Sequence, residues 1–227
     1  MADVELVDSG VHATVRMRPA GAGLGGLVRI VLAEIATAAA ACPLLFSKHA
    51  DTGAFYVGAL LGFKEGENLT LSPDGEPAFL PLEAAREGFF AVEDKIALEP
   101  AHPRFHSAGG DLLFDGEGRP TAPMKAVQQA LGGLMGSAGA TDQFITALLS
   151  HRLIEPIDIS LNFDDGERLR LEGLYTISLD AIGELDDGAA LALFRAGHLQ
   201  FAYMMAASLQ HIPLMARRRN AALAMPA

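Results

Sequence analysis

The sequence predicts an α+β fold, a single domain in which a mainly antiparallel sheet is flanked by helices. Residues 43–98 alternate short β-rich runs with polar turns, and these turns are too short for the crossovers that parallel strands need. Helical spacing of apolar residues is concentrated in other blocks, chiefly 121–149 and 187–210. Strands and helices in separate blocks, rather than in βαβ alternation, indicate an α+β architecture.

The N-terminal part is predicted to be peripheral. Residues 1–25 lack a sustained period and end in a glycine-rich stretch, so we expect an N-terminal arm or an edge strand. A helix is predicted over 27–41, because branched residues such as Ile30 and Ile35 recur at helical spacing and alanines follow them. Pro43 should end this helix.

The next part of the chain reads as a meander of strands. Its β-branched and aromatic runs are separated by Asp-Gly and Pro-Asp-Gly turns, which suit tight connections between antiparallel strands. A short helix is expected at 82–87. The predicted strands are 44–48, 54–63, 68–72, 95–98 and 111–115.

Helical spacing returns at Thr121, a suitable N-cap residue. Thr141 and Asp142 suggest the cap of a second, separate helix. The alternating runs 157–163 and 168–179 flank an Asp-Asp-Gly-Glu turn and predict a β-hairpin.

Two helices are predicted at the end of the chain, with a break at Gly197 between them and Pro213 ending the second. Three consecutive arginines at 217–219 are expected to be solvated on an exposed tail. The predicted organisation is therefore an arm (1–25), one α+β domain (26–215) and a C-terminal tail (216–227).

Composition excludes some classes of partner. The net charge of −11 repels the phosphates that a nucleic-acid-binding protein must neutralise, so we expect no nucleic-acid partner. A single cysteine, Cys42, allows no intramolecular disulfide and is expected to be a buried thiol. The first twenty residues carry early acids and no continuous apolar run, which is unlike a secretory signal; a cytoplasmic location and no transmembrane segment are therefore expected.

No motif assigns catalytic residues. The string GAGLGG (21–26) satisfies the GxGxxG pattern of dinucleotide sites but lacks the βαβ context, so no cofactor is expected. The most site-like spacing joins His102 and His106 with Asp111, which could supply two imidazoles and a carboxylate to zinc or iron. Pro103 argues against the helix that would place the two histidines on one face, and solvated loop histidines are the simpler interpretation. The acid pairs at 164–165 and 186–187 are interpreted as turn and cap residues.

Many short sequence pieces, spread over about residues 30–215, carry a resemblance to a known family. These pieces are PLLF (43–46), GFKEGENL (62–69), DG (74–75), FLP (79–81), Arg86 with GFF (88–90), LFD (113–115) with Gly118 and Thr121, GLY (173–175) with Leu179 and Leu185, and Gly197 with SL (208–209). In this order they resemble the SapC family, which is named from a bacterial surface-layer gene cluster.

The resemblance implies a bacterial protein linked by name to surface layers, with no established catalytic residues to carry over. The leading hypothesis is a non-enzymatic binding or accessory protein that serves cell-surface or outer-membrane processes and has a protein partner or self-associates. The alternative is a metal-dependent oxygenase or hydrolase that uses His102, His106 and a nearby carboxylate such as Asp111. The sequence identifies no small-molecule ligand.

Overall fold

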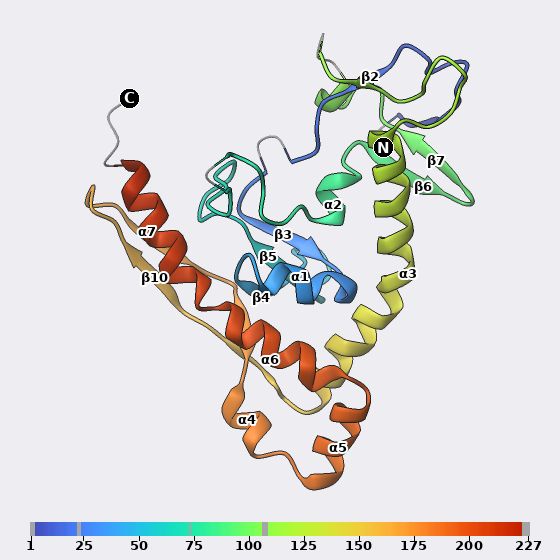
Figure 1. Ribbon diagram of the computed structural model, residues 1–227. Coiled ribbons are helices and arrows are strands. Elements are labelled where there is room, and N and C mark those ends of the chain that lie inside the picture. The colour runs from blue at the N-terminus through green and yellow to red at the C-terminus, as the bar shows by residue number, and fades with distance from the viewer. Residues whose placement is uncertain (1–2, 22–23, 73, 106–108, 224–227) are drawn as a thin grey trace. The chain divides into compact units, whose positions relative to one another are not determined.

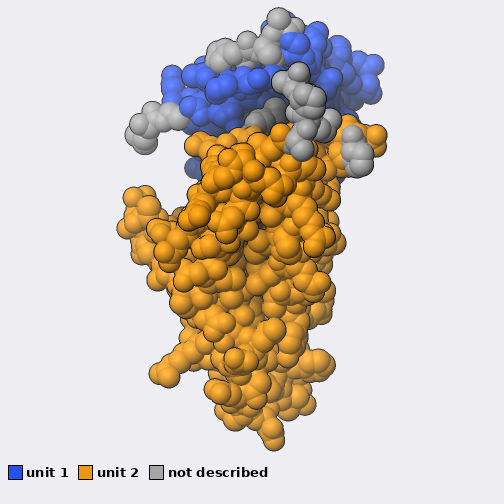
Figure 2. All heavy atoms as spheres, turned by 90° about the vertical axis from the view of Figure 1, so that its left-hand side faces the viewer, with its two compact units in different colours: residues 1–22, 82–136 blue, residues 23–81, 137–227 orange. Residues whose placement is uncertain are grey.

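The computed structural model describes residues 3–21, 24–72, 74–105 and 109–223 of the 227-residue chain. All described strand pairs are antiparallel, and helices accompany the sheets (Figure 1), so the predicted α+β class is confirmed. Contacts group the chain into two compact units: unit 1 is residues 1–22 with 82–136, and unit 2 is residues 23–81 with 137–227 (Figure 2). The predicted boundaries at residues 25 and 215 stay predictions.

Unit 1 is built on two small antiparallel sheets, with strand orders β1-β7-β6 and β2-β8. Residues near the N-terminus supply β1 and β2, which are peripheral strands paired with segments about 90 residues later in the chain. The elements are β1 (Glu5–Leu6), β2 (Arg16–Met17), α2 (Leu82–Ala85), β6 (Phe89–Val92), β7 (Lys95–Leu98), the 3₁₀ helix η2 (Pro103–Phe105), β8 (Asp111–Leu112) and the first half of α3 (Ala122–Ser150).

The core of unit 1 lies between these strands and α3. Residues three or four apart on α3 point to the same side, so the apolar spacing of the helix places one stripe in the core. The buried members are Met17, Phe89, Leu98, Leu113, Phe114, Met124, Val127 and Leu131. This core holds the strands that form the candidate site described below.

Unit 2 contains a five-stranded antiparallel sheet of order β3-β5-β4-β12-β9 and a separate hairpin, β10-β11. Helices follow the sheet strands in the last third of the chain (Figure 1). The elements are β3 (Leu27–Ile30), η1 (Leu32–Glu34), α1 (Ile35–Ala39), β4 (Leu44–Lys48), β5 (Phe55–Leu60), the rest of α3, β9 (Ile154–Pro156), β10 (Ile159–Asn162), β11 (Arg168–Leu171), β12 (Tyr175–Ile177), α4 (Leu179–Gly183), α5 (Asp187–Arg195), α6 (His198–Ser208) and α7 (His211–Leu223).

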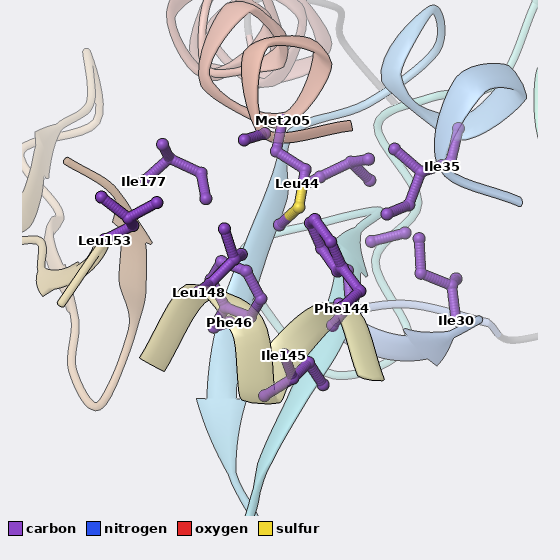
Figure 3. Close-up of a cluster of buried hydrophobic side chains, with 14 of the residues drawn as sticks. Ile30, Ile35, Leu44, Phe46, Phe144, Ile145, Leu148, Leu153, Ile177 and Met205 are labelled. Atoms are coloured by element: carbon purple, nitrogen blue, oxygen red, sulfur yellow. The ribbon is translucent and has the colours of Figure 1, made fainter. Parts of the chain in front are cut away.

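The main core of unit 2 surrounds Phe144 of α3 (Figure 3). Its ring lies 6.5 Å from that of Phe46 on β4, and the ring of Phe201 on α6 meets it edge-on at 6.1 Å. Cys42 is fully buried in the same cluster, and burial raises the pKa of its thiol to about 12. The prediction that Cys42 is a buried thiol is therefore confirmed.

The helix predicted to start at residue 27 is partly wrong. Leu27–Ile30 forms strand β3, which pairs with β5 in a register that sets Leu27 opposite Leu60. Gly58 makes this pairing close, since a side chain at Gly58 would lie 2.6 Å from Leu27. The branched residues fit a strand as well as a helix, and the long-range partner decided between them. Helix appears only from residue 32 onward.

The break predicted near residue 140 is also wrong, because α3 continues without interruption from Ala122 to Ser150. Thr141 and Ser137 are not cap residues of α3 itself. Their hydroxyl oxygens accept hydrogen bonds from the backbone N–H groups of Leu32 (2.9 Å) and Ala33 (3.2 Å), at the start of η1. The helix therefore satisfies the free donors of another helical segment, a role that only the tertiary structure supplies.

The C-terminal helices differ from the prediction at Pro213. Helix α6 ends at Ser208, and Pro213 lies in the first turn of α7, where its missing N–H costs no internal hydrogen bond. Helix α7 then crosses the predicted tail boundary and reaches Leu223.

The predicted strand at 68–72 is reduced to one bridge between Leu71 and Pro77. None of the described helices is long and apolar enough to cross a bilayer.

Candidate functional site

Unit 1 contains a cavity of about 380 Å³. This volume lies within the range of roughly 300–1,000 Å³ that is typical of small-molecule sites. One part of its lining is apolar: Val11, Val15, Leu98, Pro100 and Phe105. The other part carries charge or hydrogen-bonding groups: Glu5, His12, Thr14 and Arg16. Such a lining combines a surface for an apolar ligand with groups that can orient it.

A compact turn positions the lining residues between β1 and β2. The Asp8 carboxylate accepts hydrogen bonds from the backbone N–H groups of Gly10 (2.8 Å) and Val11 (3.0 Å). These two bonds stabilise the charged form and lower the pKa of Asp8, with the Val11 bond contributing most. The turn sets His12 beside β1, where Glu5 pairs with Leu98 of β7.

His12 is the buried polar group of the cavity wall, with only 4% of its surface exposed. One ring nitrogen, Nδ1, lies 3.1 Å from both the backbone nitrogen and the carbonyl oxygen of Asp8, so it accepts from the first or donates to the second according to the tautomer; the other ring nitrogen is Nε2. That Nε2 is buried and makes no hydrogen bond to the described residues. It lies 3.5 Å from Oε2 of Glu5, a separation longer than that of a good hydrogen bond.

A second wall group, Arg16, comes from β2. Its Nη1 donates to the backbone carbonyl of Gly110 at 2.8 Å, which anchors one arm of the guanidinium. The side chain also carries Nε and Nη2, which have no partner among the residues that the structure describes. Because a guanidinium offers donors in a planar fork, Arg16 retains donors for a ligand after this anchor is made.

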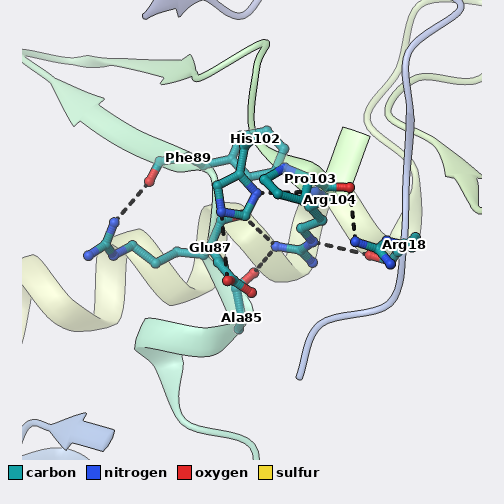
Figure 4. Close-up of polar contacts among 8 residues, drawn as sticks. Arg18, Ala85, Glu87, Phe89, His102, Pro103 and Arg104 are labelled. Carbon is teal, nitrogen blue, oxygen red and sulfur yellow. Dashed lines mark hydrogen bonds and ion pairs between the residues drawn. The ribbon is translucent and has the colours of Figure 1, made fainter. Parts of the chain in front are cut away.

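Arg104 precedes the cavity residue Phe105 and makes several polar contacts with neighbouring segments, which Figure 4 shows. Its buried guanidinium donates from Nε to the carbonyl of Arg18 (3.1 Å), and from Nη1 to the carbonyls of Ala85 and Glu87 (both 2.9 Å). Burial lowers the pKa of Arg104, and the nearby Glu87 carboxylate acts in the opposite direction. Through these bonds Arg104 links the 3₁₀ helix η2 to the residues around Arg18 and to the segment 85–87.

The histidine singled out from the sequence lies in this same region. Nδ1 of His102 accepts from the backbone N–H of Arg104 at 3.2 Å, and its Nε2 lies 3.7 Å from Glu87. Gly88 allows this packing, since its φ is +80° and a side chain there would lie 3.1 Å from the His102 ring. The structure therefore brings His102 together with Glu87, a carboxylate that the sequence spacing did not identify.

The predicted metal set is not assembled by the described residues. Asp111 is exposed on β8, in register with Met17, and His106 falls outside the residues that the structure describes. Among the described residues there is no group of three His, Cys, Asp or Glu side chains arranged to hold a metal ion. Metal binding by His102, His106 and Asp111 thus stays a prediction.

Other sequence motifs have structural roles. Asp186 caps α5 through the N–H of Ala189 at 2.9 Å, and Asp165 accepts from Glu167 at 2.9 Å in the hairpin turn, as predicted. The described end of the glycine-rich string leads into strand β3 rather than a helix, and a side chain at Gly25 would lie 2.4 Å from the Glu67 carbonyl. These contacts account for the motifs by packing and capping.

The prediction of solvated C-terminal arginines is wrong for Arg219, which is 6% exposed in unit 2. Its Nη2 donates to Glu167 at 2.7 Å, and its Nε lies 3.3 Å from Glu67. The guanidinium also lies 4.2 Å from the centre of the Phe163 ring, a cation–π contact. The network fastens α7 to the hairpin turn and to the loop after β5.

Sequence reasoning missed Glu5, His12 and Arg16 because the first 25 residues were interpreted as an arm. Asp8 followed by Gly10 is a local signal for the turn, since Asp side chains commonly accept from backbone N–H groups two and three residues on. No local signal shows that β1 pairs with β7 or β2 with β8. The cavity exists only through these long-range pairings.

Comparison with known proteins agrees with the resemblance seen in the sequence. No curated protein and no solved structure matches the chain. The model of one family, SapC, matches residues 8–214, which include the turn at Asp8, the Arg104 region and nearly all of unit 2. Since this match covers most of the 227 residues, the chain belongs to the SapC family.

Proposed function

We propose that this protein is a non-enzymatic binding or accessory protein and that the cavity of unit 1 is its ligand site. The observation that supports the proposal is the cavity of about 380 Å³ with both apolar and charged walls. The proposal includes a cytoplasmic location and a role in bacterial cell-surface or outer-membrane processes. Those parts rest on the N-terminal sequence and on family membership.

The arrangement of His12 suits binding. Its buried Nε2 lies 3.5 Å from the Glu5 carboxylate and makes no hydrogen bond to the described residues, so it places a polar group beside the apolar part of the cavity wall. A preformed polar element beside apolar walls orients a ligand at low entropic cost. Ligand capture therefore needs no large rearrangement of the β1–β2 turn.

Thr14→Trp is expected to weaken binding of the apolar fluorescent probe anilinonaphthalene sulfonate about tenfold or more, equivalent to roughly 1.4 kcal/mol. Thr14 is exposed and lines the cavity, so an indole at this position would occupy the space of the probe. The measurement is a fluorescence titration of the folded protein under native conditions.

Ala13→Trp is the matched control. Ala13 is the neighbouring exposed residue of the same turn and does not line the cavity. It adds the same indole to a chain that has no tryptophan, so any general effect of the aromatic group appears in both variants. Equal probe affinity in the two variants would show that the cavity is not the binding site.

Self-association or a protein partner forms the second part of the proposal. Large apolar side chains are exposed on consecutive helices of unit 2: Leu191 (47%) and Phe194 (68%) on α5, and Tyr203 (52%) on α6. Exposed apolar side chains of this size favour association. In sedimentation velocity we expect a species larger than the monomer, reduced by Phe194→Ser; a monomer at every concentration tested would contradict self-association.

A further inference from the structure

We infer that the unit 1 cavity takes a small zwitterion with an apolar body, such as an apolar amino acid or a short apolar peptide. This inference rests on the proposed function and adds the chemical class of its ligand. Three features carry it: an acidic residue, Glu5, a basic residue, Arg16, and an apolar surface all belong to the lining of one cavity.

Glu5 provides the site for a cationic group. One carboxylate oxygen, Oε2, lies 3.5 Å from the buried Nε2 of His12. The side chain is 54% exposed, so the carboxylate remains accessible, and the described residues offer it no Lys or Arg partner. An ammonium group entering the cavity would therefore supply a positive charge that no Lys or Arg of the described part of the chain supplies.

Arg16 provides the site for an anionic group. The bond from its Nη1 to the Gly110 carbonyl restrains the guanidinium without neutralising it, since a carbonyl carries no formal charge. No Asp or Glu is paired with Arg16 among the described residues. A ligand carboxylate would find a charged, partly anchored donor group whose binding fork is already ordered.

The remaining lining selects an apolar body. Val15 and Leu98 extend from the core side of unit 1, and Phe105 is held edge-on to the buried Phe89 ring at 5.1 Å. The cavity volume of about 380 Å³ lies in the range of small-molecule sites, so it offers room for a free amino acid or a dipeptide. A ligand with only one charge would leave either Glu5 or Arg16 without its counter-ion.

Calorimetric titration of the full chain tests this with matched ligands. The zwitterions are L-phenylalanine and the dipeptide phenylalanyl-alanine, whose relative affinities distinguish a free amino acid from a peptide as the source. Phenethylamine lacks the carboxylate and hydrocinnamate lacks the amine. We expect at least one zwitterion to bind about tenfold or more tightly than either singly charged analogue.

Two variants assign the charges. Glu5→Gln should reduce zwitterion affinity about tenfold and leave hydrocinnamate binding unchanged. Arg16→Gln should also reduce zwitterion affinity about tenfold, but it should leave phenethylamine binding unchanged. Asp94→Asn and Lys95→Gln are the controls, because both are exposed unit 1 residues that do not line the cavity. Far-ultraviolet circular dichroism of each variant verifies that it is folded.

Equal binding of zwitterions and singly charged analogues would overturn the inference, as would equal losses in the Glu5 and Asp94 variants. Failure of both zwitterions to bind would also overturn it. In that case the probe titration of the Thr14 and Ala13 variants still decides separately whether the cavity is a ligand site. The two proposals therefore fail on different measurements.

Discussion

Replacing Phe144 by Ala is expected to lower the free energy of unfolding of unit 2 by about 3–5 kcal/mol. Phe144 is fully buried and lies between Phe46, Phe201 and His198, whose rings are 6.5, 6.1 and 5.7 Å away. Truncation removes the apolar contacts of the ring and leaves a cavity that these rigid neighbours cannot fill. The loss therefore includes both a transfer contribution and a cavity contribution.

The experiment is urea unfolding followed by tyrosine fluorescence. The chain has three tyrosines and no tryptophan, and Tyr56, Tyr175 and Tyr203 all belong to unit 2, so the signal reports on the unit that contains Phe144. Linear extrapolation with an unchanged slope gives the difference in stability.

Phe194→Ala provides the control for the loss of a phenyl ring. Phe194 lies on α5 of the same unit and is 68% exposed, so its removal should change stability by no more than about 0.5 kcal/mol. Protein concentration is kept low so that association does not contribute to stability. If both variants lost the same amount, the ring of Phe144 would not be part of a close-packed core.

Replacing Arg104 by Met is expected to destabilise unit 1 by about 2–4 kcal/mol. Met retains much of the apolar stem and part of the volume but has no N–H donors. The carbonyls of Arg18, Ala85 and Glu87 would each lose the donor that now lies 2.9–3.1 Å away. Because buried acceptors without donors are costly, the loss should exceed that of an exposed arginine.

Amide hydrogen exchange locates this effect. Exchange should accelerate in peptides covering residues 82–105, while peptides from the β4–β5 hairpin keep their wild-type protection. We also expect weaker probe binding, since the Arg104 segment carries Phe105 into the cavity wall.

Arg18→Met is the matched control for the Arg104 variant. Arg18 is exposed and donates one described side-chain hydrogen bond, to the Pro103 carbonyl at 2.9 Å, so its loss should cost less than about 1 kcal/mol. Unchanged exchange in the Arg104 variant would mean that the three carbonyls find water instead, and that Arg104 does not organise the segment.

Local sequence patterns predicted much of the fold because they report on local energies. The β-rich runs at 44–48 and 54–63 correspond to β4 and β5, and the run 157–163 forms the β10–β11 hairpin with the first part of the run 168–179. The second part of that run is wrong as a hairpin strand, because Tyr175–Ile177 is β12 of the five-stranded sheet. Branched and aromatic side chains favour a pleated surface, and Asp-Gly turns favour short connections. Where turn and strand preferences agreed, no distant contact was needed to identify the element.

The errors occurred where a distant partner outweighed a local preference. Leu27–Ile30 has helical spacing but forms a strand that pairs with β5, where Gly58 allows the close approach. Thr141 is a typical N-cap residue, but it lies inside α3 and its hydroxyl accepts a hydrogen bond from the backbone N–H of Leu32. Helix α3 also continues through several glycines before Thr141. Each glycine inside a helix costs only about 1 kcal/mol, which the packing of α3 can offset. Arg219 looked solvated because the sequence does not show that Glu67 and Glu167 lie beside α7.

The sequence by itself determined the α+β class, the antiparallel hairpins and the SapC family, because these depend on short-range preferences and on residues in order along the chain. The tertiary structure alone decided that Glu5, His12 and Arg16 line one cavity and that His102 lies beside Glu87. The physical reason is sequence distance. Strands β1 and β2 acquire their hydrogen-bond partners about 90 residues later in the chain, and the free energy that selects those partners comes from burying a shared core.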